Sequence, residues 1–157
     1  MFTQYLNQRR HMLKLVVRMK NNREKHLRLQ KKKIIEIWGD TPLSKEIENI
    51  CMKHNLDLFK LIQCCEKKGQ DIRVAMGHVL AMPTMFDIIS QCECGEVMGF
   101  ENDVYKELKK LYSDGKIKCK RCDHDHFEKL KKVTIQLGYR KGGISMDLPM
   151  KPEDLGF

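Results

Sequence analysis

Four cysteines in two close pairs are the residues of this chain best suited to chemistry. One residue separates Cys92 from Cys94, two separate Cys119 from Cys122, and 24 residues lie between the pairs. Thiolates close together in a sequence can curl around one ion, and zinc prefers four such ligands in a tetrahedron. Gly95 allows a tight turn directly after the first pair. We therefore predict one structural Zn²⁺ held by these four cysteines.

The cysteine pattern resembles that of the zinc-ribbon group, in which two cysteine hooks clamp one zinc ion. The resemblance covers residues 92–122 only, and no family is recognised for the whole chain. It departs from the usual pattern because the first hook is CxC rather than CxxC. The segment between the hooks also favours a helix over strands. The resemblance implies a small metal module that contains both helix and strand.

Two histidines, His124 and His126, follow the second hook. Either could replace Cys92 or Cys94 as a ligand, because imidazole is an equally good zinc donor. Alternatively, both are exposed to solvent after the metal site. A catalytic zinc site would need an open coordination position and a nearby base, and the zinc-hydrolase and deaminase motifs are absent. We therefore expect a structural metal and no enzymatic activity.

The excess positive charge lies in the first quarter of the chain. The net charge is +9, and residues 1–39 carry 11 Lys and Arg against only Glu24 and Glu36. Such segregation is typical of a helix that binds a polyanion, most often nucleic acid, although a solvated helix face is the alternative. The candidate contacts on this segment are Arg9, Arg10, Lys14, Arg18, Lys25, Arg28, Lys31 and Lys32.

Residues 1–39 are expected to form a basic helical arm. No Gly or Pro lies between Gln4 and Trp38, which predicts one long helix or two helices joined near residues 21–22. Lys20 interrupts the apolar stripe, which argues against a self-standing coiled coil. We expect the stripe to pack on the rest of the protein with the basic residues outward. Its main members recur at multiples of seven, at Leu6, Leu13, Leu27 and Ile34.

Residues 40–83 are expected to form a short bundle of three helices. Thr41 and Pro42 provide a helix start, Asn55 a left-handed turn, and Pro83 a stop. The first two helices could also form a helix-turn-helix, although turns of this spacing are frequent in plain bundles. In that case residues 57–68 would be the recognition helix. Its candidate nucleic-acid contacts are Lys60, Lys67 and Lys68.

Residues 84–141 are expected to form the zinc-binding module, followed by an extended tail over residues 142–157. Segments 87–91 and 96–100 are strand candidates, and residues 102–113 are an amphipathic helix. Residues 126–137 are ambiguous between helix and strand. The predicted fold is therefore mainly α: a long basic N-terminal helix and a small helical bundle, followed by a C-terminal α+β zinc-ribbon-like module.

The seven cysteines are an odd number, and the chain shows no secretory signal peptide, so thiols used for metal are favoured over disulfides. We expect a cytoplasmic or other reducing compartment rather than secretion. No apolar run is long enough for a membrane span.

The sequence as a whole predicts a non-catalytic, zinc-containing nucleic-acid-binding protein, either a transcription-regulatory or a nucleoprotein-complex factor, with DNA ahead of RNA. The alternative is a protein-docking factor or inhibitor. Such a factor would bind a larger nucleoprotein machine through its long helix, zinc site and tail.

Overall fold

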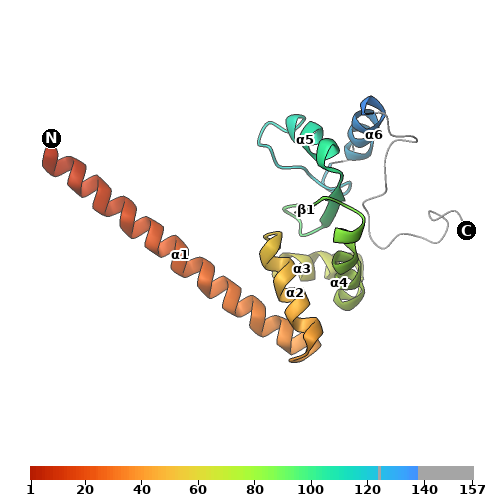
Figure 1. The fold of residues 1–157 in the computed structure, drawn as a ribbon, viewed down its shortest axis with the longest axis horizontal. Helices are drawn as coiled ribbons and strands as arrows, with labels where there is room; N and C mark the ends of the chain where they lie inside the picture. The colour runs from red at the N-terminus through yellow and green to blue at the C-terminus, as the bar shows by residue number, and fades with distance from the viewer. Residues whose placement is uncertain (124, 138–157) are drawn as a thin grey trace, which may run out of the picture. The chain divides into compact units, whose positions relative to one another are not determined.

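The structure is a computed structural model that describes residues 1–123 and 125–137 (Figure 1). Within these residues the chain forms six α-helices, one 3₁₀ turn and a two-stranded sheet near the C-terminal end. This confirms the predicted fold class, mainly α with an α+β part. His124 and the predicted tail, residues 142–157, lie outside the described residues. The contacts divide the chain into two compact units, residues 1–48 and 49–157.

The first unit contains a single uninterrupted helix, α1, Phe2–Trp38, and not two helices. It ends where Gly39 adopts a φ of 79°, a conformation that favours glycine. The next helix, α2, Pro42–Lys53, begins with proline at its first position, as predicted. The Ser44 hydroxyl donates a hydrogen bond to the Gly39 carbonyl and so closes the turn between the two helices.

The apolar stripe of α1 is exposed over its N-terminal part, and the expectation that it packs is wrong there. All side chains of residues 1–25 are exposed, with Leu13 at 57% and Val16 at 60%. The buried residues of α1 are Gln30 and Ile34. The physical reason is that Arg9 and the other cations on this side of the helix oppose burial unless each finds a partner.

The second unit begins in α2 and continues through α3, Leu58–Lys68, and α4, Ile72–Ala81. Asn55 adopts the predicted left-handed conformation, with a φ of 52°. The side chain of Asp57 accepts a hydrogen bond from the backbone N–H of Lys60 and so caps α3. A 3₁₀ turn, η1, Met82–Thr84, contains Pro83 and ends the helical segment. Three cysteines of this segment are buried: Cys51, Cys64 and Cys65.

The metal-module part of this unit is built on a hairpin and two helices. Strands β1, Ile88–Gln91, and β2, Val97–Phe100, pair antiparallel, with Gln91 opposite Val97. Helices α5, Asn102–Lys110, and α6, His126–Gln136, lie beside each other (Figure 1). The ambiguous segment is therefore a helix. One hydrophobic cluster joins these elements and includes two of the four cysteines: Cys92, Met98, Phe100, Val104, Leu108, Tyr112, Ile117, Cys119, Leu130 and Val133.

In the described residues, no helix is both long enough and apolar enough to cross a membrane.

Candidate metal centre

The four cysteines predicted from their spacing lie together at one point of the second unit. The sulfur atoms of Cys92, Cys94, Cys119 and Cys122 all lie within 4.8 Å of one another, and those of Cys94 and Cys119 are 3.5 Å apart. With Zn–S bonds of about 2.3 Å, the edge of a tetrahedron of sulfurs would be about 3.8 Å. The four thiols are therefore positioned to hold one metal ion.

The first hook is the turn of the β1–β2 hairpin. The backbone N–H of Cys92 donates to the Glu96 carbonyl at 2.8 Å, and that of Gly95 donates to the Cys92 carbonyl at 2.9 Å. Gly95 has a φ of 104°, which side-chain-bearing residues rarely adopt. The compact turn places Cys92 in the core, while Cys94 remains half-buried.

The side-chain amide of Gln91 fixes the hairpin to the start of α3. Its Oε1 accepts from the backbone N–H of Asp57 at 2.6 Å, and its Nε2 donates to the carbonyls of Asp57 at 2.9 Å and Gly95 at 3.0 Å. A Cβ on Gly95 would lie 2.0 Å from the carbonyl oxygen of Lys60. The first cysteine hook therefore lies directly against the backbone of α3.

A buried carboxylate makes a second connection between the hairpin and α3. Glu96 is 6% exposed, forms an ion pair with Lys68, and accepts a hydrogen bond from the Cys64 thiol at 3.4 Å. Burial lowers the pKa of Lys68, but the hydrogen bond and charge of Glu96 outweigh this and hold it above its ordinary value. The ammonium of Lys68 is therefore held in an ion pair with the buried Glu96. Lys60 and Lys67 are exposed on α3.

The second hook is a tight turn that also contacts the first. The backbone N–H groups of Cys122 and Asp123 both donate to the Cys119 carbonyl, at 3.1 and 3.0 Å. The N–H of Cys119 donates to the sulfur of Cys92 at 3.4 Å, so the two hooks meet directly. Cys119 is 2% exposed and Cys122 is exposed, which gives the site one solvent-facing side.

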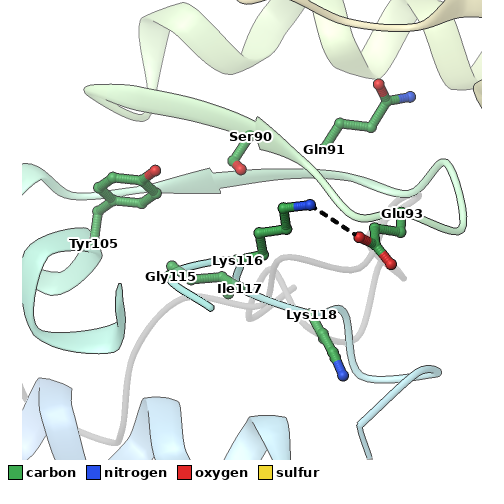
Figure 2. A pocket seen from close by; sticks show the side chains of 8 residues that line it. All are labelled: Ser90, Gln91, Glu93, Tyr105, Gly115, Lys116, Ile117 and Lys118. Carbon is green, nitrogen blue, oxygen red and sulfur yellow. Dashed lines mark hydrogen bonds and ion pairs between the residues drawn. The ribbon is translucent and has the colours of Figure 1, made fainter. Parts of the chain in front are cut away.

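A small pocket lies between β1 and the segment that leads into the second hook. Figure 2 shows the ammonium of Lys116 reaching Glu93, and the two charges are 3.3 Å apart. Both side chains are more than two-thirds exposed, so this ion pair contributes little to stability. The remaining lining residues are Ser90, Gln91, Tyr105, Gly115, Ile117 and Lys118.

His126 is buried and does not belong to the group of possible ligands. It is 4% exposed, and its Nδ1 lies 3.3 Å from the hydroxyl of Tyr112, which donates to Asp123. The expectation that His126 is solvent-exposed is therefore wrong. The helical period could have revealed it, because His126 lies four and seven residues before Leu130 and Val133, which are buried on the same face of α6.

The pKa values of Cys94, Cys119 and Cys122 are shifted in different directions. Burial raises the pKa of Cys94, but hydrogen bonds from the Glu96 backbone N–H and from the thiols of Cys119 and Cys122 hold it below its ordinary value. Burial raises the pKa of Cys122 to about 11 and also raises that of Cys119. A bound divalent cation would supply the positive charge that allows all four thiols to ionise.

The basic residues predicted on the arm are all exposed along α1. At 3.6 residues per turn, six of them fall within about 80° of the helix circumference. Arg9 and Lys31 lie elsewhere on the circumference. We call the six residues the basic stripe: Arg10, Lys14, Arg18, Lys25, Arg28 and Lys32.

The chain matches no protein-family model, no curated protein and no solved structure.

Proposed function

We propose that this protein binds nucleic acid without catalysis, through the basic stripe of α1, and that the four cysteines hold one structural Zn²⁺. It would act in a transcription-regulatory or nucleoprotein complex in a reducing compartment, where thiols stay available for metal. The observation that carries the proposal is the basic stripe, an exposed row of six cations on a helix that contains no Asp or Glu before Glu24.

The dimensions of the basic stripe suit a duplex. At a rise of about 1.5 Å per residue, the distance from Arg10 to Lys32 is about 33 Å, close to the roughly 34 Å of one turn of B-form DNA. Cations spaced along this length can neutralise a row of phosphates without reading bases. DNA remains favoured over RNA as the nucleic acid that the stripe binds. The exposed Lys60 and Lys67 of α3 are secondary candidates for contacts.

The ligand set supports a structural rather than a catalytic metal. Four thiolates fill the four positions that zinc uses in closed structural sites, so none is left for a reactive water. The set of soft sulfur ligands favours zinc over harder ions such as Mg²⁺. The resemblance to zinc ribbons supports this part of the proposal, because in zinc ribbons two cysteine hooks also bind one ion. The site contributes folding free energy to the module that carries it.

The test compares two triple substitutions that remove the same charge from different sides of α1. One variant carries Arg10→Gln, Arg18→Gln and Lys25→Gln, all in the basic stripe. The control carries Arg9→Gln, Lys20→Gln and Arg23→Gln, which lie outside it. Dissociation constants of the full chain for a 30-base-pair duplex and for a structured RNA are measured across a salt series.

The parent is expected to show a slope of log affinity against log salt of up to about −5, since each neutralised duplex phosphate contributes about −0.9. The stripe variant should lose at least tenfold in affinity and flatten the slope by about 2 to 3. The control should change much less. Equal losses in the two variants, or weak binding with no salt dependence, would exclude the basic stripe as the nucleic-acid site. The polymer bound more tightly decides between DNA and RNA.

A further inference from the structure

The other side of α1 carries a group of exposed apolar side chains. Seven side chains lie within about 140° of the helix circumference, and most are more than half exposed. Single exposed apolar residues are ordinary, but a contiguous group marks an interaction surface. We call it the apolar face: Phe2, Tyr5, Leu6, Met12, Leu13, Val16 and Val17.

The charges around the apolar face restrict what can cover it. Arg9 lies in its middle, and Lys20 and Arg23 continue the same side of the helix towards the C-terminus. Residues 1–23 carry six Lys and Arg and no carboxylate. A partner that covers this face must supply the missing negative charge, because a buried cation without a partner is strongly unfavourable.

This charge requirement disfavours a second copy of the same helix. Two apolar faces in contact would bring Arg9, Lys20 and Arg23 of one copy against the same three residues of the other, with no Asp or Glu in residues 1–23 of either copy to compensate. Nucleic acid is disfavoured for another reason, because a phosphate backbone offers no apolar surface for Leu13 and Val16. A protein groove can supply both an apolar floor and acidic rims, and amphipathic helices commonly bind in such grooves.

We propose that the apolar face of α1 docks into an apolar groove of a partner protein whose rim carries Asp or Glu side chains. Phe2, Leu6 and Leu13 contact the apolar floor of the groove. The long side chains of Arg9 and Lys20 extend from the middle of the face, so that their charged ends pair with carboxylates at the rim. This surface goes beyond the proposed nucleic-acid function, because it is a separate site with a different partner. The basic stripe lies on another part of the circumference, so one helix can contact a protein and a phosphate backbone together.

The experiment uses Ca²⁺-loaded calmodulin as a probe, because its Met-rich apolar grooves bind basic amphipathic helices. Binding of the full chain is measured by calorimetry at 150 mM salt. The test variant carries Leu13→Ala and Val16→Ala, which keep a high helix propensity, so loss of the helix is not the cause of any effect. Far-UV circular dichroism of the variant checks that the helix is retained.

The parent should bind the probe with a dissociation constant below about 1 µM. The alanine variant should bind at least tenfold more weakly, and Arg9→Gln with Lys20→Gln at least fivefold more weakly. No binding, or equal binding by parent and alanine variant, would overturn the proposal. So would self-association that Leu13→Ala with Val16→Ala abolishes, or binding to phosphatidylserine vesicles in place of the probe.

The same alanine variant separates this proposal from the nucleic-acid function. Its dissociation constant for the 30-base-pair duplex should stay within twofold of the parent's, because the basic stripe is intact. Loss of probe binding with unchanged duplex binding supports the docking surface. A chain that binds the probe through this face but binds no nucleic acid would overturn only the proposed function.

Discussion

A single glycine decides how closely the first cysteine hook approaches α3. Gly95 combines a φ of 104° with a position where a Cβ would lie 2.0 Å from the Lys60 carbonyl oxygen and 3.0 Å from the Cys64 Cβ. The contact with Lys60 is to backbone, which moves only if the helix moves. Glycine is therefore required here for two independent reasons, its backbone conformation and the space around it.

We predict that Gly95→Ala lowers the free energy of unfolding of the metal-loaded protein by about 3 kcal/mol, because it adds both backbone strain and a steric clash. The matched control is Gly77→Ala in α4, where a Cβ meets nothing within 4 Å. Alanine there should be neutral or stabilise by up to about 1 kcal/mol. Urea unfolding followed by circular dichroism measures both, and equal stability of the two variants would contradict the prediction.

At the scale of elements, β1 and the start of α3 are joined through one side chain. The Gln91 amide uses its oxygen and both hydrogens of its nitrogen in three hydrogen bonds, two to Asp57 and one to Gly95. These bonds satisfy backbone groups at the N-terminus of α3 and in the cysteine turn. The position of the metal hook relative to α3 therefore depends on this residue.

Replacing Gln91 with alanine should destabilise the metal-loaded protein by about 2 kcal/mol, since it removes three hydrogen bonds to partly buried backbone groups. Amide hydrogen exchange at Asp57 should accelerate with it. Gln63→Ala, at an exposed position of α3, is the control and should change stability by less than about 0.5 kcal/mol. The idea fails if Gln91→Ala leaves both stability and the exchange rate at Asp57 unchanged.

Local sequence patterns predicted most of these helices and strands. They could not predict contacts between residues far apart in the sequence. Pro42, Asp57 and Gly69 begin, cap or end helices through their own backbone preferences, so the sequence places them within a residue or two. The cysteine hooks were predictable because ligand spacing is itself local. The Gln91–Asp57 contact joins residues 34 positions apart, and no periodicity encodes it.

The apolar stripe of α1 shows why the helical spacing of apolar residues alone led to the wrong expectation of burial. Apolar residues at helical spacing usually indicate a face that packs within the protein. Here Arg9, Lys20 and Arg23 share that side, so burial inside the chain would need a carboxylate beside each of them. A count of charges on the apolar side, and not only of apolar residues, would have predicted the exposure.

At the scale of the whole molecule, the excess positive charge and the candidate metal site fall in different units. The basic stripe belongs to residues 1–48, whereas the four cysteines belong to residues 49–157. The binding of zinc at a structural site contributes an apparent free energy of about 10 to 16 kcal/mol to folding, as much as the entire stability of a typical domain. The metal should therefore control the folding of the second unit and leave the charge of the first unchanged.

Metal removal is the last prediction, and it separates the two units. A strong chelator should remove one zinc per chain, measured by mass spectrometry of the metal, and abolish the cooperative thermal transition of the second unit. Cys119→Ser should do the same, whereas Cys65→Ala, equally buried but outside the cysteine cluster, should keep the metal and lose only about 1 to 2 kcal/mol. Affinity for the duplex should stay within threefold after chelation, because the proposed phosphate contacts come from the basic stripe of α1. Loss of duplex binding together with the metal would show that the second unit, and not α1, carries the nucleic-acid site.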